Sequence, residues 1–280
     1  MFNYKQHNYL ISVFKDSMNI INHDTYLLRS VEQSIAMQQF IAEGAEIVLP
    51  QPPNTEQARL IVTKNRSFEA ARQYAEQGYR VAVLNFASST NPGGGVTSGA
   101  SAQEECLCRV STLYSCLKAE SMWDRFYEPH RKTANPLHND DIIYTKDVLV
   151  FKDDDYQPLE KPFMVDVITC AAPTLREKAS NRFNPYDGDK APDITSGELL
   201  AIHEKRGRKI IAAAAVNGAQ VLILGAFGCG AFRNDPKVVA QAYKNILPDY
   251  LRYFNAVEFA VYCRAYDLRN YNIFKEVLIL

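Results

Sequence analysis

Residues 80–95 have the sequence RVAVLNFASSTNPGGG, a short apolar run rich in valine followed by a loop with three consecutive glycines. Such a run is typical of a β-strand that is buried on both faces of a parallel or mixed sheet. Residues 163–173 (FMVDVITCAAP) and 221–232 (VLILGAFGCGAF) also join a buried-strand pattern to a turn-rich segment. The segments after residues 86 and 224 both contain clustered glycines. Because open α/β sheets bind ligands at the carboxyl ends of their strands, we expect these two glycine loops to share one site.

The segments around these strands include several helical patterns. Residues 24–43 carry apolar side chains near a 3.6-residue period, with Asp24 as a cap and Gly44 as a stop. Further helices are predicted at residues 67–77, 101–118, 196–217, 236–250 and 272–280, and further strands at residues 46–49, 58–63 and 257–263. Strands that alternate with helices predict a three-layer α/β/α fold with a mixed, largely parallel sheet.

The chain contains neither an internal repeat nor a linker, so we expect one domain over residues 1–280. Residues 1–60 are interpreted as an N-terminal helical extension. Residues 119–162 are interpreted as an irregular insertion, with two hairpin-like runs inside residues 142–151. Two acidic clusters in this insertion, at residues 139–141 and 153–155, are expected to be solvated turns.

The composition excludes several classes of protein. Lys and Arg (31) balance Asp and Glu (32), so a general nucleic-acid binder or a binder of anionic membranes is not expected. The first 19 residues lack a secretory pattern, and no apolar run approaches the length of a membrane span, so we expect a cytoplasmic protein. The six cysteines form no C-x-x-C pair and the five histidines are scattered, so neither a metal nor another cofactor is expected.

Each glycine loop has the composition of an anion site. The first glycine loop comprises residues 91–95 (NPGGG), and the second glycine loop comprises residues 225–232 (GAFGCGAF). Clustered glycines allow the backbone to approach a ligand, and their N–H groups can hold phosphate oxygens without Lys or Arg. Asp235 and Pro236 then begin a helix whose amide dipoles favour an anion. Neither loop is a Walker A or a G-x-G-x-x-G motif, which disfavours a kinase, a P-loop NTPase or a Rossmann dehydrogenase.

Two adjacent carboxylates follow the first glycine loop. Seven residues separate Gly95 from the sequence Gln103-Glu104-Glu105, which begins a predicted helix. A structural alternative is a capping box, in which Ser101 and Glu104 cap their own helix. The functional interpretation places one carboxylate against a sugar hydroxyl and the other against a bond to be cleaved. A helix N-terminus lowers a carboxyl pKa whereas burial and a neighbouring charge raise it, and the sequence leaves open which effect prevails.

This combination resembles a known family. The spacing GGG, seven residues, QEE is similar to the GGG-x(6–8)-QEE signature of poly(ADP-ribose) glycohydrolases, and residues 165–173 and 225–236 resemble other motifs of their bacterial-type, macrodomain-only branch. The resemblance extends over residues 63–263, while residues 1–60 and 119–162 carry no motif that matches. It implies a macrodomain-like fold and a metal-independent glycosidase that hydrolyses ribose–ribose O-glycosidic bonds and releases ADP-ribose.

The resemblance also implies roles for individual residues. Glu105 would be the acid and base of catalysis, and Glu104 and Gln103 would align ribose hydroxyls. Asn91 would shape the first glycine loop. The resemblance implies that backbone amides of both loops hold the diphosphate and that two phenylalanines pack on ribose or adenine. The ligand-binding residues are therefore expected to be Gln103, Asn91, Gly93, Gly94, Gly95, Gly225, Phe227, Gly228, Cys229, Gly230, Ala231 and Phe232.

Three alternatives remain at the level of sequence. A macrodomain can bind ADP-ribose without cleaving it, and a related enzyme can remove single ADP-ribose units from proteins. A cysteine hydrolase that uses Cys229 is a further alternative, but residues 227–231 lack the outer glycines of G-x-S-x-G and no histidine is placed to act as its base. The expected partners are ADP-ribose, poly(ADP-ribose) or macromolecules that carry ADP-ribose.

Overall fold

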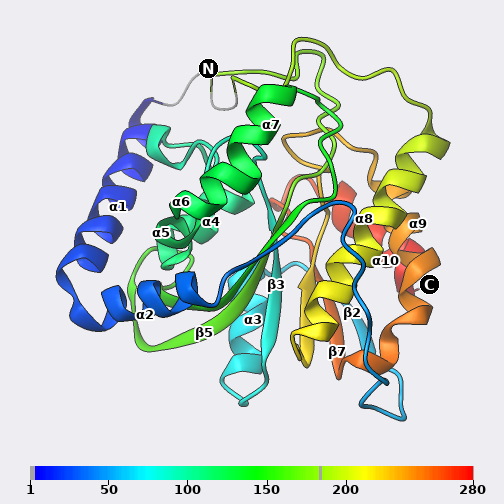
Figure 1. The fold of residues 1–280 in the computed structure, drawn as a ribbon, viewed down its shortest axis with the longest axis horizontal. Coiled ribbons are helices and arrows are strands. Elements are labelled where there is room, and N and C mark those ends of the chain that lie inside the picture. The colour runs from blue at the N-terminus through cyan, green and yellow to red at the C-terminus, as the bar shows by residue number, and fades with distance from the viewer. Residues whose placement is uncertain (1–3, 183–184, 280) are drawn as a thin grey trace.

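The computed structural model describes residues 4–182 and 185–279, which are built around a seven-stranded sheet (Figure 1). The order across the sheet is β1, β4, β5, β3, β6, β7, β2. The strands are β1 (Gln39–Ile41), β2 (Arg59–Thr63), β3 (Val81–Phe86), β4 (Ile142–Lys152), β5 (Pro158–Cys170), β6 (Val221–Leu224) and β7 (Ala256–Ala260). The block from β5 to β2 is parallel, and β4 and β1 add an antiparallel edge. The sheet is therefore mixed and largely parallel, which confirms the predicted fold class.

Helices lie on both faces of this sheet. The α-helices are α1 (Tyr4–His23), α2 (Thr25–Ala36), α3 (Ser67–Ala75), α4 (Gln103–Val110), α5 (Leu113–Leu117), α6 (Glu120–Met122), α7 (Glu128–Thr133), α8 (Ser196–Val216), α9 (Pro236–Ile246) and α10 (Arg269–Ile279). Leu84 belongs to the core under α8, α9 and α10, whereas its neighbour Val83 belongs to the core under α3 and α4. Successive side chains of a strand point to opposite faces, so β3 contributes to both cores. Figure 1 shows the resulting three layers.

Three of the predicted helix starts have side-chain caps. The Asp24 carboxylate accepts from the N–H groups of Tyr26 and Leu27, and the Asp235 carboxylate accepts from Lys237. At the start of α8 the Thr195 hydroxyl accepts from the Glu198 N–H. Each cap satisfies amides that have no partner inside the helix. α3 begins without a side-chain cap of this kind: its N-cap is Arg66, and Glu69 accepts from the Arg66 N–H.

Three predicted elements differ from the structure. The helix expected to reach residue 43 ends at Ala36, and Gln39–Ile41 turns instead into edge strand β1 beside β4. The strand expected at residues 46–49 is absent from the described fold, where this segment has no regular structure. The helix expected at residues 101–118 is divided, since Ser111 has an extended backbone between α4 and α5 and forms a bridge to Val150.

The expected irregular insertion is largely regular. Residues 119–162 contain α6, a π-helical turn at Trp123–Tyr127, α7, the whole of β4 and the start of β5. The two hairpin-like runs are parts of the single bulged strand β4, whose partner is β5. The expectation missed this because the pairing that makes β4 regular joins it to residues beyond the segment.

One of the two acidic clusters is buried. Asp140 is 3% exposed and pairs with Arg206 of α8 at 2.9 Å, and Asp141 accepts from the Glu43 N–H at 2.6 Å. The expectation of a solvated turn at residues 139–141 is therefore wrong. Asp153–Asp155 does form the turn between β4 and β5, with an exposed Asp155. Buried carboxylates require partners, and Asp140 obtains its partner from a distant helix.

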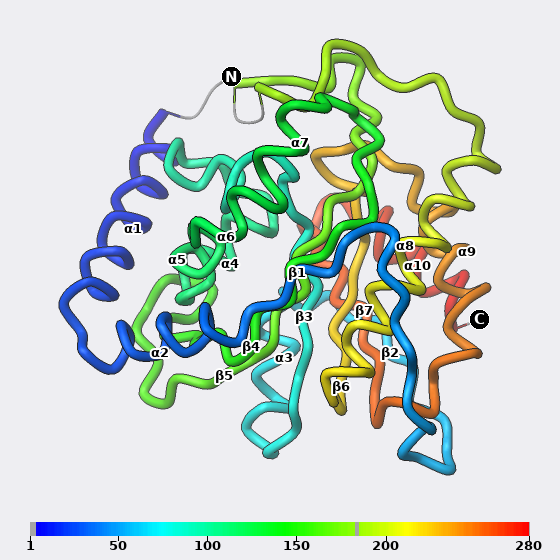
Figure 2. Tube along the Cα trace, in the orientation of Figure 1, coloured from blue at the N-terminus to red at the C-terminus, as the bar shows by residue number. Residues whose placement is uncertain are grey.

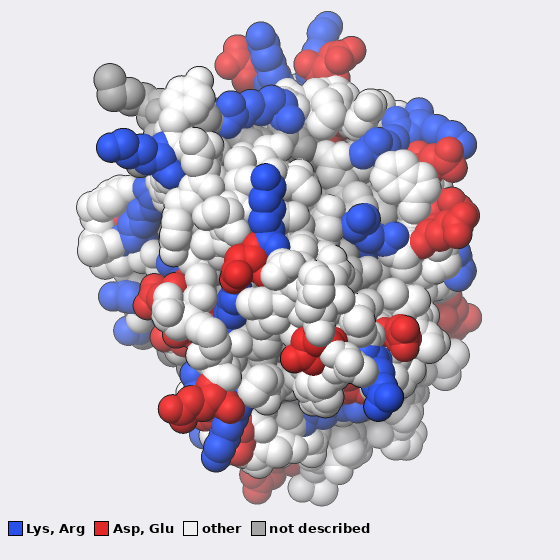
Figure 3. All heavy atoms as spheres, turned by 90° about the vertical axis from the view of Figure 1, so that its left-hand side faces the viewer, with Lys and Arg blue, Asp and Glu red and all other residues white. Residues whose placement is uncertain are grey.

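One face of the molecule carries side chains of both charges (Figure 3). Figure 3 shows the face at the left of Figure 1, where Lys and Arg side chains are interspersed with Asp and Glu. This agrees with the formal net charge of −1. Among the described helices, none combines the length and the apolar character needed to span a bilayer.

Candidate active site

A cleft of about 1080 Å³ lies at the carboxyl ends of the parallel strands and brings the two glycine loops together. The segments that follow β3, β5 and β6 meet above this edge of the sheet (Figure 2). Its lining includes residues of both loops, the start of α4 and part of α1: Gln6, Leu10, Phe86, Ser88, Gly94, Gln103, Glu104, Glu105, Arg176, Gly228, Gly230, Ala231 and Phe232. The expectation of one shared site for the loops is met by this geometry.

Glu105 lies in the first turn of α4, lines the cleft and is 7% exposed. Its Oε1 accepts from the Gly95 N–H at 2.8 Å, while its Oε2 is buried and has no hydrogen-bond partner within the described residues. Burial raises the pKa of this carboxyl, although the Gly95 amide and the Arg109 guanidinium oppose the rise. The structure thus indicates that desolvation outweighs the helix N-terminus, which is the direction that a general acid near neutral pH needs.

Glu104 is held more completely than Glu105. Its Oε2 accepts from the Ser88 N–H at 2.7 Å, and its Oε1 accepts from Asn85 Nδ2 at 3.2 Å. Burial raises its pKa well above the ordinary range, and the charge of Glu105 adds to the rise, while amides including that of Gly93 oppose it. The capping-box alternative is wrong, because the N-cap of α4 is Ala102 without a side-chain bond and the Glu104 side chain turns back to β3.

Gln103 connects α4 to β3. Its Oε1 accepts from the Phe86 N–H at 2.9 Å, and its Nε2 donates to the Leu84 carbonyl at 2.8 Å and to Ser67 Oγ at 3.0 Å. These contacts use both donors of the amide and its oxygen. The geometry therefore differs from the expectation that Gln103 aligns a ribose hydroxyl: the side chain fixes the helix that carries the two glutamates.

The first glycine loop uses its amides internally. The Gly94 N–H donates to the Asn91 carbonyl at 2.9 Å and the Gly95 N–H donates to Glu105, while the Gly93 amide bonds to Glu104. The expectation that residues 93–95 hold a diphosphate is corrected by this pattern. Because carboxylates accept hydrogen bonds strongly, the loop instead fixes the two glutamates.

Gly94 makes the closest contact between loop and carboxylates. It has φ +57°, and a Cβ atom there would lie 2.5 Å from Glu105 Oε1 and 3.1 Å from Glu104 Oε2. Only glycine fits this position without displacing a glutamate. Of the three consecutive glycines, Gly94 alone lines the cleft, whereas Gly93 faces the Tyr114 ring.

Within the described residues, several backbone N–H groups of the second glycine loop have no hydrogen-bond partner. Its internal bonds take the N–H groups of Phe227 and Cys229, which donate to Gly225 and Ala226. Within residues 4–182 and 185–279, no hydrogen bond has the N–H of Gly228, Gly230, Ala231 or Phe232 as its donor. These same four residues line the cleft, whereas Phe227 and Cys229 do not. An anion in the cleft would therefore meet backbone donors from this loop.

Three predicted ligand residues of this loop, Gly225, Phe227 and Cys229, do not line the cleft. Phe227 is 1% exposed and packs at 5.7 Å, between ring centroids, on Phe86 and at 5.9 Å on the His203 ring, so it belongs to the core. Gly225 is needed for packing, since a Cβ would lie 2.8 Å from the Ala260 carbonyl. Cys229 is half-buried and burial raises the pKa of its thiol, which removes support for a cysteine nucleophile.

Phe232 does line the cleft and lies beside a cation. The Arg176 guanidinium stands over its ring at 5.3 Å from the centroid and pairs with Asp187 at 3.1 Å. The Thr90 hydroxyl donates to Asp187 at 3.2 Å, which ties this pair to the segment before the first glycine loop. Burial raises the pKa of Asp187 to about 6, against the opposing effect of Arg176.

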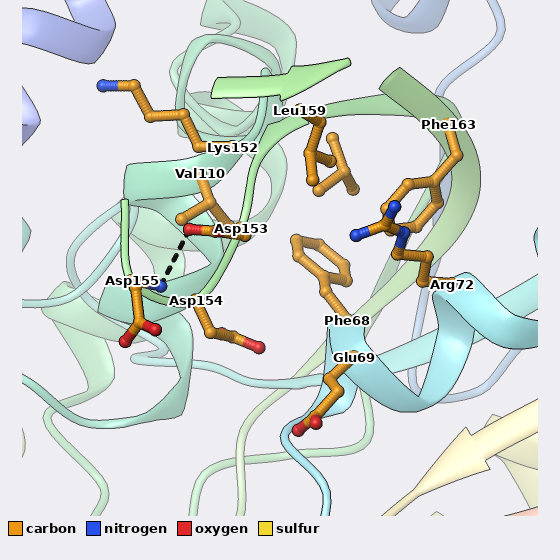
Figure 4. A pocket seen from close by; sticks show the side chains of 11 residues that line it. Phe68, Glu69, Arg72, Val110, Lys152, Asp153, Asp154, Asp155, Leu159 and Phe163 are labelled. Carbon is orange, nitrogen blue, oxygen red and sulfur yellow. Dashed lines mark hydrogen bonds between the residues drawn. The ribbon is translucent and has the colours of Figure 1, made fainter. Parts of the chain in front are cut away.

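A second cavity, of about 240 Å³, lies between α3 and the turn from β4 to β5 (Figure 4). Phe68, Phe163 and Leu159 form apolar walls. Most of its polar side chains are engaged with neighbours: Arg72 with Glu76, Lys152 with Asp16 and Ser17, Asp153 with two backbone amides, Asp154 with Arg66 and Glu69 with the Arg66 N–H. We assign it no chemistry.

Comparison with known proteins decides the family. The family described as microbial-type PARG, catalytic domain, matches residues 15–153. The X-ray structure of poly(ADP-ribose) glycohydrolase (PARG) from Thermomonospora curvata is 30% identical, with a TM-score of 0.84, and the match covers 96% of this chain and 99% of that chain. The chain belongs to the microbial-type PARG family. The PARG of Deinococcus radiodurans in complex with ADP-ribose is 31% identical, with a TM-score of 0.76, over 89% of this chain and 96% of that chain.

A third PARG structure, the T. curvata protein bound to the inhibitor ADP-HPD, matches with a TM-score of 0.79 at 30% identity, over 96% of this chain and 99% of that chain. No curated protein matches. The PARG match is wider than the motifs indicate. It extends beyond residues 63–263, and the family model includes most of the two segments, residues 1–60 and 119–162, in which no family motif was found.

Several residues of this PARG site were missed from sequence. Asn85 is a polar residue inside an otherwise apolar strand, and that interruption was a usable signal. Arg131 lies between the rings of Trp123 and Tyr186 and donates to the Thr90 carbonyl at 2.6 Å and to the Asn91 side chain. No local pattern marks Arg131, because its partners are distant in sequence. Within the described parts of the chain, no group of three or more His, Cys, Asp or Glu side chains could hold a metal ion.

Proposed function

We propose that this chain is a poly(ADP-ribose) glycohydrolase that hydrolyses the ribose–ribose O-glycosidic bond of ADP-ribose polymers and releases ADP-ribose. The observation that carries the proposal is the placement of Glu105: a buried carboxyl with one oxygen fixed by Gly95, facing the same cleft as the open amides of the second glycine loop. Family membership supports the same activity, since PARG structures with ADP-ribose and with an inhibitor are among the matches.

Glu105 has the environment of a carboxyl that works as acid and then as base. Its raised pKa favours the protonated form, which can donate to the glycosidic oxygen as the bond to the anomeric carbon breaks. The resulting carboxylate keeps the Gly95 hydrogen bond and can take a proton from the water that attacks the oxocarbenium-like centre. Water is consumed, the glycosidic oxygen leaves as a hydroxyl, and Glu105 ends protonated as it began.

Glu104 and the ligand loops complete the proposed site. Glu104 orients a ribose hydroxyl from a carboxylate already fixed by Ser88 and Asn85. The diphosphate binds the N–H groups of Gly228, Gly230, Ala231 and Phe232, and the Phe232 ring packs on ribose or adenine. Asn91 and residues 93–95 act indirectly, because they hold the two glutamates rather than the ligand.

The wider assignments follow the same proposal. The three-layer fold and the position of the cleft support a macrodomain-type glycohydrolase domain, which we propose to extend over the whole chain. All six cysteines are unpaired, which supports a reducing, cytoplasmic location. The partners are then ADP-ribose polymers or proteins that carry ADP-ribose.

The test is release of ADP-ribose from purified poly(ADP-ribose), measured by chromatography, together with calorimetric binding of ADP-ribose. Wild type should release the monomer, and Glu105→Gln should not. Glu258→Gln is a matched control, because Glu258 is also a buried glutamate (1% exposed) but lies in β7 with Tyr74 and Thr63 as partners. Glu258→Gln should retain the activity.

Two results would contradict the proposal. If wild type binds ADP-ribose but releases none from the polymer, the chain is a binding module rather than a hydrolase. If Glu105→Gln hydrolyses the polymer at the wild-type rate, the assignment of Glu105 as acid and base is wrong.

A further inference from the structure

We infer that Asn234 and His203 form a buried positioning pair, which holds the second glycine loop in the conformation that presents its free amides to the cleft. This rests on the proposed function, because it assumes that those amides bind the diphosphate of ADP-ribose. Neither residue lines the cleft, so both would act through the loop backbone.

Asn234 connects the middle and the end of the second glycine loop to the segment that follows β5. Its Nδ2 donates to the Pro173 carbonyl at 2.7 Å, to the Gly228 carbonyl at 3.1 Å and to the Phe232 carbonyl at 3.4 Å. Its own N–H donates to the Gly228 carbonyl at 3.0 Å. One buried side chain, 2% exposed, thus gathers loop carbonyls on the side away from the cleft.

Two carbonyls of the loop have further partners. The Gly230 carbonyl accepts from the Arg233 N–H at 3.1 Å, and the Phe232 carbonyl also accepts from the Leu175 N–H at 2.8 Å. With carbonyls engaged on the inner side, the N–H groups of Gly228 and Ala231 are left without protein partners in the described structure. The residues whose amides are free also line the cleft. This coincidence indicates that the positioning pair, Asn234 and His203, determines which backbone groups face a ligand.

His203 fixes the orientation of the Asn234 amide. Its Nε2 lies 2.8 Å from Asn234 Oδ1. Because an amide oxygen only accepts hydrogen bonds, Nε2 carries the proton and donates it, which leaves Nδ2 of Asn234 for the carbonyls. His203 is 1% exposed on α8, and burial lowers its pKa to about 4, so the ring is a neutral donor at physiological pH. In the opposite orientation, the Asn234 Nδ2 group would face the His203 Nε2–H, and two donors would meet.

The positioning pair explains the left-handed backbone found in the loop and directly after it. Gly228 has φ +76°, and a Cβ there would lie 2.6 Å from Ala172 Cβ and 2.7 Å from Asn234 Nδ2. Arg233, which is not a glycine, has φ +60°. A left-handed backbone at such a residue persists when the surroundings determine it. Substitution of Asn234 or His203 should let the loop relax and move its free amides away from the cleft.

The experiment compares calorimetric ADP-ribose affinity with kcat at saturating poly(ADP-ribose) for Asn234→Asp, His203→Leu and His203→Gln. Asn234→Asp removes the donors at constant shape, and His203→Leu removes the donor to Oδ1. Both should raise the Kd for ADP-ribose about tenfold or more, a loss expected from misplaced hydrogen bonds, with kcat within about threefold. The kcat is preserved because Gly95, in the other loop, holds Glu105.

His203→Gln is the conservative variant, since its side-chain N–H can replace Nε2 as the donor, and it should bring the Kd back to within about threefold of wild type. Ile246→Ala is the matched control: it truncates a fully buried side chain of α9, lowering the melting temperature without a change in Kd. Circular dichroism melts identify variants that fail to fold, and if Asn234→Asp does so, His203→Leu carries the comparison with the control.

Three outcomes overturn the inference: an unchanged Kd in folded Asn234→Asp, an equal rise in Kd in Ile246→Ala, or a fall in kcat with unchanged Kd. Failure of the proposed function gives a different result, namely no release of ADP-ribose by wild type. In that case the ratio of ADP-ribose affinities between wild type and variants still decides whether the pair positions the loop. A wild type that binds no ADP-ribose at all overturns both.

Discussion

Substitution of Gly94 by alanine should separate the arrangement of the proposed catalytic carboxylates from the binding of the ligand. The new Cβ would lie 2.5 Å from Glu105 Oε1, about 0.9 Å inside the 3.4 Å at which ordinary van der Waals contact begins. The Glu105 carboxylate must move by a similar distance, and a misplacement near 1 Å at a reacting group costs about 100-fold in rate. Alanine at φ +57° also costs about 1–2 kcal/mol of stability.

Gly218→Ala is the matched control for that backbone cost. Gly218 has φ +76°, but a Cβ there would meet nothing within 4 Å. Both variants should therefore lose similar stability in thermal melts. Only Gly94→Ala should lose about 100-fold in kcat on poly(ADP-ribose), and its Kd for ADP-ribose should stay within about threefold, because the open amides belong to the second glycine loop.

The reasoning fails if Gly94→Ala turns over at the wild-type rate, since the carboxylate would then tolerate displacement. It fails equally if Gly218→Ala loses as much activity, because strain alone would then account for the effect. A parallel loss of kcat and ADP-ribose affinity in Gly94→Ala would show that the first glycine loop also binds the ligand.

Three further predictions concern the same region. Glu105→Gln should remove turnover while the Kd for ADP-ribose stays within a few-fold and the melting temperature is unchanged or higher, because the amide resembles the protonated acid that burial favours; a large fall in melting temperature would mark Glu105 as structural. Phe227→Leu should lower the melting temperature with little effect on KM, whereas Phe232→Leu, at a buried ring that also lines the cleft, should raise KM; a rise in KM for Phe227→Leu alone would restore Phe227 as a ligand residue. Asp187 holds its proton more tightly in the folded chain, with a pKa of about 6 against an ordinary 3.8, so the free energy of unfolding should fall as pH rises from about 4 to about 6; Asp187→Asn should flatten this fall by up to about 1.4 kcal/mol per pH unit in denaturant titrations, and an unchanged slope would contradict the assignment.

The sheet and the position of the site were predictable because they depend on local patterns. Continuous apolar runs at residues 80–86 and 221–225 mark strands buried on both faces, and such strands place the loops that follow them at one edge. The spacing from Gly95 to Glu105 is likewise local. These features require no knowledge of which distant residues meet.

The remaining features depend on distant partners. Asp140 was expected in a solvated turn because its partner Arg206 lies 66 positions away on α8. Phe227 and Phe232 both follow a Gly-Ala pair, and both are buried, yet only Phe232 lines the cleft. Gln103 and the amides of residues 93–95 were assigned to the ligand because nothing in the sequence shows that protein groups already occupy them.

The open amides of the second glycine loop have a practical consequence for mutagenesis. Backbone donors survive every side-chain substitution except proline, so an alanine scan across Gly228 to Phe232 would leave the proposed anion contacts chemically present. Such a scan would report only on the Phe232 ring and on the strain at Gly228. Residues outside the cleft that shape the backbone would carry the measurable effects, and a survey confined to residues that line the cleft would miss the residues that form the proposed diphosphate site.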